Sequence, residues 1–546
     1  MSKICETLDN NFKKYADKRL YLFFDGYEVV ESVTYSEFEQ RVKNFAGYMQ
    51  SLKSAGARAL ILLPSSVDYL TAYFGCMYSN TVSVPLYEIN EENQINDLKS
   101  IIENCGAEYI ITAERYVSQL NEWLGDIAED LVFCTIDNYT VRPYTEIETK
   151  DEDVAYLQYT SGSTKRAKGV RITYDNVYAT CRNMRDHLLF CDTDVFVTWL
   201  PLHFDMGLLG CNVNPIFTGG CSCLTSASAF MKHPDSWLNA VNVYRGTVLI
   251  APNFAYEMCV KLPEEFLEKL DLSCVRLTIN GSELVRNSTL TALAHKLEKF
   301  GLKPDTFNPS YGLAENTLVV SSHKPGTGYR YVTIDEENLH ENTIEFCEEG
   351  LDIVACGKIC NGVGVDIVSL EDGTVLDEDE IGEVIVTGDS VADGYWQDEE
   401  ESGFHVSEDG EKYLETGDLG FIHDDHLYIV GRKKDVIIIR GKNLYSQDIE
   451  ELILKASEDR ADTAVAFSYD DGNDEKLIII VETDEVDETE QEDIINKVQI
   501  AVASKCGIVP SKILLKPRGY LIRTDSGKVQ RQTCKKQYIN SLCAVR

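Results

Sequence analysis

Short apolar runs alternate with segments of helical periodicity through the first 150 residues, and this alternation restricts the fold more than any other feature. Residues 59–63 and 82–86 are apolar runs of strand length, and residues 67–78 between them have the length of a helix. The alternation continues through a helical pattern around residues 97–104 and an apolar run at 109–112. Strands that alternate with helices predict an α/β fold whose mostly parallel sheets are covered by helices on both faces.

The pattern changes near residue 355, where the apolar runs become shorter and turns become more frequent. This change indicates a small β-rich subdomain. After residue 433 two helical patterns and two strand patterns follow, which is enough for a separate small α+β domain. We therefore predict a large N-terminal domain over residues 1–432, with the β-rich subdomain at about 355–432, and a small C-terminal domain over 433–546.

Composition disfavours several classes of protein. The chain has 546 residues and a formal net charge of −39, whereas a basic surface is the usual footprint of nucleic-acid binding. No run of about 18 apolar residues is present and the N-terminus lacks an apolar signal segment, so we expect no membrane span and a cytoplasmic location. The 17 cysteines are scattered along the chain, which indicates reduced core thiols rather than zinc ligands.

A polar loop rich in glycine follows the apolar run at residues 154–159. Residues 160–169 contain four hydroxyl side chains, two glycines and three cations. Glycines let backbone N–H groups approach a polyphosphate, hydroxyls donate hydrogen bonds to it, and cations pair with it. A Walker P-loop would need Gly at Ala167 and Ser or Thr at Gly169, so this loop is of another kind. By composition alone, an ordinary polar surface loop is an equally good interpretation.

Polar residues also follow several later apolar runs. Judged alone, each has an ordinary explanation. His203 and Asp205 can be a satisfied pair in the core, and Asp418, which follows Gly417, can simply form a turn. The order of the segments along the chain is more informative than any one of them. They are Ser310-Tyr311-Gly312-Leu313-Ala314-Glu315, Thr416-Gly417-Asp418, Gly431-Arg432-Lys433-Lys434-Asp435 and Ser526-Gly527-Lys528.

Together with the loop at 160–169, these segments resemble those of the adenylate-forming enzymes. The resemblance covers about residues 5–540 and is greatest to the fatty acyl-AMP ligases. Two features resemble that group in particular. One is the segment at 199–210 together with residues 251–256, and the other is the long stretch between Ser321 and Cys356, where these ligases carry an insertion. The resemblance implies that the insertion restrains a mobile small domain and disfavours coenzyme A as the acceptor.

The implied reaction is attack of a fatty carboxylate on the α-phosphorus of ATP, which gives acyl-AMP and pyrophosphate. Transfer of the acyl group to the phosphopantetheine thiol of an acyl carrier protein follows. A carboxylate and a triphosphate repel each other, so the site must supply cations and positioning. The resemblance implies that Lys528 bridges the two anions and that Lys434 is the hinge that brings Lys528 into the site and withdraws it.

The other site residues take their implied roles from the matching segments, with ATP and Mg²⁺ as cofactors. Glu315 and Thr164 would hold Mg²⁺, Asp418 would accept both ribose hydroxyls, and Arg432 would support the ribose or a phosphate. The implied catalytic residues are Lys528, Arg432 and Glu315. The residues implied to bind ATP or AMP are Thr160, Ser161, Gly162, Ser163, Thr164, Lys168, Gly281, Ser282, Glu283, Asn308, Ser310, Tyr311, Gly312, Asp418, Arg432 and Lys528. The implied acyl pocket comprises His203, Phe204, Asp205, Met206 and Gly207.

The chain departs from the family pattern at two places. Lys165 and Ala167 stand where the family's phosphate loop usually has Gly and Pro, which makes this loop more cationic. His203 lies one position away from the usual His of the acyl-pocket segment. Because carrier proteins are acidic, we also expect a cationic docking patch near the hinge and tail. Its candidate members are Lys433, Lys434, Arg440, Lys442, Arg531, Lys535 and Lys536.

Three alternatives stay open. An acyl-CoA synthetase would transfer the acyl group to coenzyme A instead of a holo carrier protein. In an amino-acid adenylation domain Asp205 would pair with an α-amino group, although the residues that follow, 206–210, disfavour this interpretation. A non-catalytic adenylate-binding homologue would explain the altered phosphate loop, but the chain retains all four of Lys528, Asp418, Arg432 and Glu315.

Overall fold

The computed structural model describes most of the chain. The described residues are 1–160, 168–339, 343–397, 403–407, 410–439, 442–458, 460–470, 475–485, 487–506, 508–523 and 529–543.

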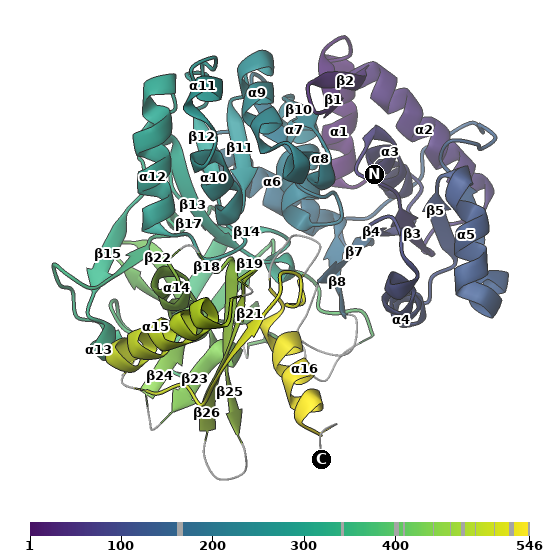
Figure 1. Ribbon diagram of the computed structural model, residues 1–546. Helices are drawn as coiled ribbons and strands as arrows, with labels where there is room; N and C mark the ends of the chain where they lie inside the picture. Colours follow the sequence, from purple (N-terminus) through teal and green to yellow (C-terminus); the bar gives the residue numbers. More distant parts are fainter. Residues whose placement is uncertain are drawn as a thin grey trace.

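A nine-stranded sheet is the largest sheet of the described chain (Figure 1). Its inner strands pair in parallel, whereas β2, β14 and β17 pair antiparallel at its edges. In sheet order the strands are β17 (Lys358–Ile359), β14 (Val319–Ser322), β13 (Phe307–Gly312), β12 (Leu277–Asn280), β11 (Val248–Ala251), β9 (Val195–Thr198), β10 (Cys221–Leu224), β1 (Arg19–Asp25) and β2 (Glu28–Thr34). Its helices are α1 (Lys3–Lys14), α6 (Tyr174–Leu188), α7 (Asn214–Thr218), α8 (Ala227–Lys232), α9 (Pro234–Tyr244), α10 (Asn253–Val260), α11 (Glu264–Leu267) and α12 (Asn287–Leu297).

A second, six-stranded sheet is parallel except at β8, which pairs antiparallel with β7. In sheet order its strands are β6 (Val132–Thr135), β5 (Tyr109–Thr112), β3 (Arg58–Leu62), β4 (Val82–Leu86), β7 (Val154–Thr160) and β8 (Lys168–Thr173). Its helices include α2 (Tyr35–Ser51), α3 (Val67–Tyr78), α4 (Ile95–Cys105) and α5 (Glu114–Leu124). The predicted α/β fold with mostly parallel sheets is confirmed.

The local signals behind that prediction are visible in the structure. Every residue of β4 is buried, as expected of a strand covered on both faces. The Ser66 hydroxyl accepts a hydrogen bond from the backbone N–H of Tyr69, and this cap fixes the start of α3.

One segment differs from what its local sequence indicates. Residues from Pro309 to Gly312 belong to strand β13. Proline and glycine are typical of loops, yet here the neighbouring strands β12 and β14 pair with the segment from both sides. Tertiary pairing therefore overrides the local signal.

Antiparallel strands follow in the region where the sequence predicts short strands and turns. They are β18 (Val363–Val368), β19 (Gly382–Gly388), β20 (Phe404–Val406), β21 (Lys412–His423) and β22 (His426–Arg432). The C-terminal segment, which we define as the described residues from 433 to 543, contains strands and helices of its own, and Figure 1 draws it below the large sheets. They are β23 (Val436–Ile439), β24 (Lys442–Tyr445), α14 (Ser446–Ala456), β25 (Thr463–Asp470), β26 (Glu475–Glu482), α15 (Glu488–Cys506), β27 (Lys512–Lys516) and α16 (Arg531–Cys543). Helix α16 was not predicted.

The C-terminal segment has its own hydrophobic core. One cluster includes Ile453 of α14 and Val498 of α15, and another joins Phe467 of β25 to Tyr538 of α16. Within the described chain, both clusters consist only of residues from this segment. A core that is separate from the large sheets is what an independently packed domain requires.

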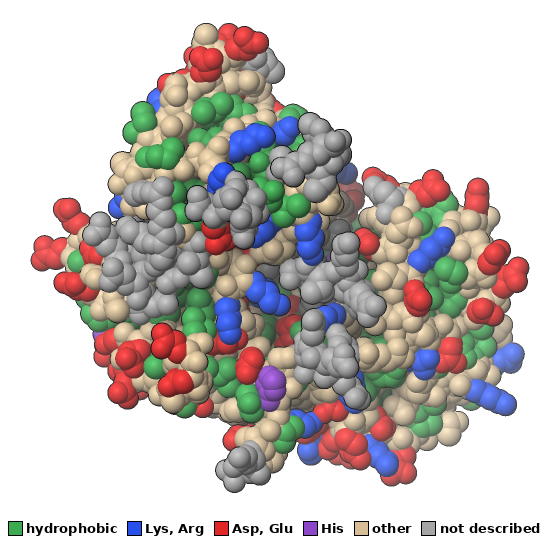
Figure 2. Space-filling model, turned by 90° about the horizontal axis from the view of Figure 1, so that it is seen from below, with side chains coloured by type: hydrophobic (Ala, Val, Ile, Leu, Met, Phe, Trp, Pro, Cys, Tyr) green, Lys and Arg blue, Asp and Glu red, His purple; other side chains and the backbone are tan. Residues whose placement is uncertain are grey.

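Charge is distributed unevenly over the face seen in Figure 2. Asp and Glu side chains lie mostly around its edge, whereas Lys and Arg side chains gather toward its middle.

In the part of the chain that the structure describes, no helix is long and apolar enough to cross a membrane.

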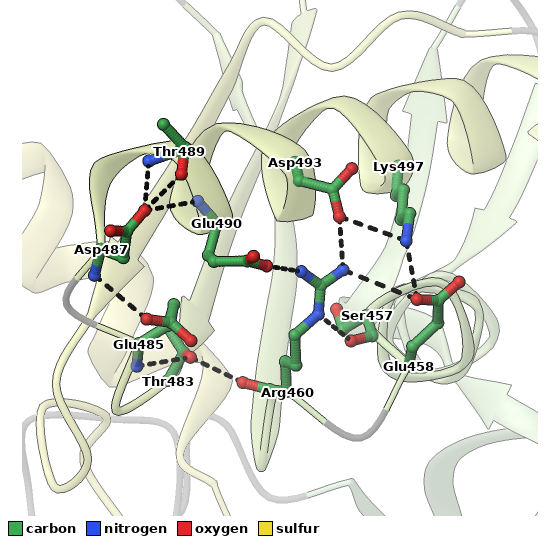
Figure 3. Close-up of polar contacts among 10 residues, drawn as sticks. All are labelled: Ser457, Glu458, Arg460, Thr483, Glu485, Asp487, Thr489, Glu490, Asp493 and Lys497. Carbon is green, nitrogen blue, oxygen red and sulfur yellow. Dashed lines mark hydrogen bonds and ion pairs between the residues drawn. The ribbon is translucent and has the colours of Figure 1, made fainter.

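A network of ion pairs joins the loop after α14 to helix α15 (Figure 3). The Arg460 guanidinium contacts the carboxylates of Glu490 and Asp493 at 2.7 Å each, and Lys497 contacts Glu458 at 2.7 Å. Asp487 accepts hydrogen bonds from backbone N–H groups at the start of α15. Ion pairs between exposed side chains contribute little to stability, so this network joins the two segments without stabilising the fold substantially.

The stretch between Ser321 and Cys356 contacts both the antiparallel strands and the C-terminal segment. It contains β15 (Tyr331–Ile334), α13 (Glu336–Leu339) and β16 (Leu351–Val354). Ile334 and Ile353 pack in one hydrophobic cluster with Phe421 of β21 and Tyr445 of β24. An ion pair between Arg286, which precedes α12, and Glu451 of α14 also joins the large sheet to the C-terminal segment.

His323 lies at the start of this stretch and is 2% exposed. Its Nε2 is 2.9 Å from the carbonyl oxygen of Ala355, and its ring faces His426 at 5.5 Å. Burial lowers the pKa of His323 to about 4, although the bond to Ala355 opposes this effect; His426, Arg330 and His187 lower the pKa further. The folded protein therefore holds this imidazole neutral.

We expect His323 to make the folded protein sensitive to acid. Because its folded pKa lies below the unfolded value of about 6.5, the contribution is fully present above that pH and is lost as the pH falls toward 4. The loss is ~1.4 kcal/mol for each pH unit. Urea unfolding between pH 7 and 4 measures this slope, and His323→Gln, which keeps a donor for Ala355, should flatten it. His405→Gln, at an imidazole that is 41% exposed, is the control; equal slopes for both variants would contradict the expectation.

Candidate active site

Asp418 is the centre of a buried polar cluster. The Tyr311 hydroxyl donates to its Oδ2 at 2.6 Å, and the Arg432 Nε lies 2.9 Å from its Oδ1 in an ion pair. Asp418 on β21 and Arg432 on β22 are direct cross-strand partners, whereas Tyr311 comes from β13. The Asp418 side chain is 5% exposed and that of Arg432 is 66% exposed, so the guanidinium extends from a buried carboxylate to the surface.

The electrostatics of the cluster follow from this geometry. The negative charge of Asp418 raises the pKa of Arg432. Burial, and then Asp418, raises the pKa of the Tyr311 hydroxyl well above its ordinary value. Tyr311 is therefore a neutral donor, and two donors hold the carboxylate in one orientation.

A second ion pair holds the irregular part of β21 that carries Asp418. Lys433 Nζ lies 2.8 Å from Glu383 Oε2, and the backbone N–H of Gly417 donates to Glu383 Oε1 at 3.2 Å. Gly417 has a φ of +70°, a conformation that favours glycine. The segments at 416–418 and 431–434, which the sequence singled out separately, are thus joined through one buried glutamate.

Glu315 belongs to a short 3₁₀ turn after β13. Its Oε1 accepts a hydrogen bond from the Tyr395 hydroxyl at 2.7 Å, and the Lys168 ammonium lies 5.2 Å from the centre of the Tyr395 ring. Sequence reasoning missed Tyr395, because a residue 80 positions away leaves no local pattern. Carboxylate oxygens are the ligands that Mg²⁺ prefers, so an anchored Glu315 fits the predicted metal role.

The predicted nucleotide segments at 281–283 and 308–312 lie side by side. Asn280 of β12 pairs with Pro309 of β13, so the segment at 281–283 leaves the end of β12 beside the last residues of β13. This end of parallel strands is where open α/β sheets bind ligands. A Cβ added to Gly281 would lie 2.7 Å from the carbonyl oxygen of Ser310, so this contact requires glycine. Ser282 has a positive φ of +73°, and the Glu283 carboxylate accepts the Phe254 N–H at 2.8 Å.

Asn308 and Ser310 stabilise the hairpin of β13 and β14. Asn308 Nδ2 donates to the carbonyl of His323 at 2.6 Å, and its Oδ1 accepts from the Ser322 hydroxyl at 2.6 Å. Ser310 Oγ lies 2.8 Å from Ser322 Oγ. A Cβ on Gly312 would collide with the carbonyl of Leu318. These residues shape the predicted nucleotide segment at 308–312 through contacts within the protein.

The predicted acyl-pocket residues form the entry to a π-helix, Met206–Val213. Asp205 Oδ1 accepts the backbone N–H of Met206 at 2.7 Å. Gly207 approaches the carbonyl of Pro201 so closely that a Cβ there would lie 2.2 Å from that oxygen. The His203 ring lies between the rings of Tyr87, at 5.3 Å, and Phe204, at 4.3 Å.

His203 is neutral in this environment. Burial lowers its pKa to about 3, so its imidazole adds no charge to the predicted pocket at neutral pH. Aromatic neighbours and a neutral ring suit an apolar ligand better than a charged one.

Several predicted residues lie outside the described residues. These are Ser161, Gly162, Ser163, Thr164, Lys165 and Ala167 of the loop, together with Lys528. The loop's flanks are described, because Thr160 at the end of β7 pairs with Lys168 at the start of β8. Lys434 is exposed within a 3₁₀ turn, and its carbonyl accepts a hydrogen bond from the Gln532 side chain at 3.1 Å.

Comparison with known proteins agrees with this arrangement. Residues 8–396 match the AMP-binding enzyme family. The chain is 31% identical over 547 residues to the medium-chain-fatty-acid–[acyl-carrier-protein] ligase JamA of Moorena producens, covering 96% of this chain and 92% of that protein. It is 30% identical over 599 residues to the long-chain-fatty-acid–AMP ligase FadD32 of Mycolicibacterium smegmatis, covering 99% of this chain and 94% of that protein.

The fold agrees as well. A solved structure from studies of fatty acyl-adenylate ligases from E. coli and L. pneumophila superimposes with a TM-score of 0.91 at 30% identity, covering 100% of this chain and 98% of that one. A fatty acid AMP ligase from Legionella pneumophila gives 0.76 at 29% identity, covering 98% and 96%.

Fold, site and similarity together define an adenylate-forming enzyme, and the chain belongs to the AMP-binding enzyme family. Within that family the relatives and solved structures named above are all fatty-acid ligases of the AMP-forming or carrier-loading kind. The resemblance predicted from the sequence motifs is therefore confirmed.

Proposed function

We propose that this protein is a fatty acyl-AMP ligase. It activates a fatty or other apolar carboxylic acid with ATP, releases pyrophosphate and passes the acyl group to the phosphopantetheine thiol of an acyl carrier protein. The cluster of Tyr311, Asp418 and Arg432 carries this proposal, because it holds a buried carboxylate ready for two hydroxyl donors beside an exposed guanidinium. The named relatives, a carrier-protein ligase and an AMP ligase, support it.

The proposed site residues have different roles in adenylation. Asp418 accepts the ribose hydroxyls, Arg432 contacts the ribose or a phosphate, and the segments at 281–283 and 308–312 enclose adenine. Glu315 and Thr164 would hold Mg²⁺, which supplies charge neutralisation to the phosphates when it is bound. The hydroxyls and the single glycine of residues 160–164, with Lys168, would surround the phosphates.

A division into two domains fits this chemistry. We place the large domain at residues 1–432 and the small domain at 433–546, with Lys434 as the hinge between them. The separate hydrophobic clusters of the C-terminal segment support this division. Lys528 belongs to the small domain, so rotation at the hinge would bring its charge to the carboxylate and α-phosphate and then remove it.

The pocket favours an apolar acid over an amino acid. In an amino-acid adenylation domain an aspartate must be available for the α-amino group, but Asp205 accepts the Met206 N–H at the start of the π-helix. His203, whose pKa burial lowers to about 3, adds no charge. A fatty chain, which presents only apolar surface, is the better occupant.

The acceptor is a carrier protein rather than coenzyme A. Packing of Ile353 and Ile334 against Tyr445 ties the 321–356 stretch to the C-terminal segment, as expected if this stretch restrains the small domain.

Among the candidate members of the docking patch, Lys434 and Lys536 are exposed. Figure 2 shows Lys and Arg side chains gathered toward the middle of one face of the protein. Arg531 contributes little, because Glu450 and Asp435 bind it and its side chain is 18% exposed. Arg440 lies outside the described residues, as does the side chain of Lys442.

Most of the cysteines whose side chains the structure describes are buried, and no disulfide joins any two of them. A protein that keeps its thiols reduced suits a reducing compartment, and we therefore propose a cytoplasmic location.

ATP–pyrophosphate exchange with a panel of acids tests the proposal. We expect exchange with fatty acids and none with amino acids, followed by acylation of a holo carrier protein in preference to coenzyme A. Exchange that depends on an amino acid would overturn the choice of substrate. Efficient formation of acyl-CoA would overturn the choice of acceptor, and absence of exchange with every acid would support the non-catalytic alternative.

A further inference from the structure

The segment between β19 and β20 lies between two parts of the proposed nucleotide site. On one side the backbone N–H of Ala392 donates to the carbonyl of Glu315 at 2.9 Å. On the other side the N–H of Arg171 donates to Gly394 at 2.8 Å, and the N–H of Trp396 donates to Gly169 at 2.7 Å. The backbone of residues 392–396 therefore spans the distance from the Glu315 turn to β8, the strand that follows the phosphate loop.

Tyr395 is the residue of this segment whose side chain contacts both parts of the proposed site. Its hydroxyl donates to Glu315 Oε1 at 2.7 Å, and the Lys168 ammonium lies 5.2 Å from its ring centre. The ring of Phe404 packs edge-on against it at 5.3 Å, which fixes the orientation of the phenol. One aromatic side chain thus contacts both a proposed metal ligand and a proposed phosphate-binding cation.

A phenol suits the task of holding a metal-binding carboxylate. It is a neutral donor, so it fixes the rotamer of Glu315 without neutralising the negative charge that attracts the metal. A carboxylate that accepts this hydrogen bond at Oε1 still presents Oε2 as a ligand atom for a metal ion. Partners that orient metal ligands in this way commonly contribute a factor of about 10–100 to metal affinity.

We propose that Tyr395 is a positioning residue that orients the Glu315 carboxylate toward the magnesium of the ATP complex. The proposal rests on the function proposed above, in which Glu315 holds that ion. It predicts an effect on metal affinity, whereas a merely structural tyrosine would change only the stability of the fold.

Tyr395→Phe removes the hydroxyl and keeps the ring under Lys168. We expect the Mg²⁺ concentration for half-maximal ATP–pyrophosphate exchange to rise about tenfold, with little change in rate at saturating Mg²⁺. Binding of Mn²⁺ in the presence of a non-hydrolysable ATP analogue, followed by electron paramagnetic resonance, should weaken by the same factor. The melting temperature without ligands should stay within about 2 °C of the wild type.

Two further variants make the test specific. Tyr413→Phe is the matched control, because Tyr413 lies on β21, which pairs with β19 and β20 on either side of the segment that carries Tyr395, and stacks on His405. Its metal dependence should equal that of the wild type. In a Glu315→Gln background, Tyr395→Phe should add no further loss of Mn²⁺ affinity, because both changes act through one carboxylate. An unchanged metal dependence in Tyr395→Phe alone, or a full additional loss when it is combined with Glu315→Gln, would overturn the proposal.

The outcomes also separate this inference from the proposed function. If the wild type shows exchange but Tyr395→Phe leaves metal binding unchanged, only the role of Tyr395 is wrong. If no acid supports exchange, yet Mn²⁺ binding with the ATP analogue weakens in Tyr395→Phe and not in Tyr413→Phe, the positioning role stands and the proposed reaction fails.

Discussion

Lys528→Ala should lower ATP–pyrophosphate exchange by about 10²–10³-fold, because removing one preorganised charge from a transition state typically costs that much. The carboxylate and the α-phosphate repel each other as they react, and a cation between them relieves that repulsion. The second step does not bring two anions together. Transfer from preformed acyl-AMP to a carrier thiol should therefore stay within about threefold of the wild type.

Described residues on both sides of Lys528 in the sequence are held within the C-terminal segment. Arg523 and Val529 form an antiparallel bridge. Arg523 also binds Glu482 at 2.8 Å, and Arg531 binds both Glu450 and Asp435. Burial would lower the pKa of Arg531, but Glu450 and Asp435 raise it above its ordinary value. Ion pairs therefore tie the residues that flank this part of the sequence to the body of the segment.

Single-turnover kinetics of the two half-reactions measure this prediction. Lys512→Ala is the matched control, because Lys512 belongs to the same segment and its ammonium lies over the ring of Tyr538 at 5.7 Å. It should leave both half-reactions unchanged. Equal losses of adenylation and transfer in Lys528→Ala would refute the assigned role and indicate a general defect of the segment.

The second large effect is expected at Asp418. Asp418→Asn should lower kcat/KM for ATP by about 100-fold, because hydrogen bonds to a charged group contribute about 1.5–3 kcal/mol each. The amide keeps the size of the side chain, but it removes the charge that Arg432 binds and one of the two acceptor oxygens. Most of the loss should appear in the KM for ATP.

Isothermal titration with ATP and steady-state kinetics with a fatty acid measure the effect. Asp425→Asn is the control, since Asp425 lies in the turn of the same β21–β22 hairpin, is 79% exposed and pairs with Lys358. Its positive φ of +61° also suits asparagine. Were Asp418→Asn to weaken binding of the fatty acid and leave that of ATP intact, the ribose assignment would be wrong.

Both variants concern residues that the motifs identified, but the contacts around them came from the tertiary structure. Tyr311 and Asp418 are 107 positions apart, and Glu315 and Tyr395 are 80 apart. The sequence motifs supplied three of these four residues. Tyr395 was missed because its contact with Glu315 depends on backbone hydrogen bonds, between residues 393–396 and β8, that no local pattern encodes.

The sequence by itself determined the alternation of strands and helices, the family and most of the candidate residues. Helical and strand periodicities report burial within a few neighbouring residues, so β4 at Val82–Leu86 and α3 at Val67–Tyr78 were readable from them. Only the tertiary structure decided that the proline and glycine of β13 lie in a strand. It also decided which donors hold Asp418 and Glu315. These outcomes depend on backbone and side-chain hydrogen bonds between segments far apart in the chain, whose partners are set by packing rather than by local sequence.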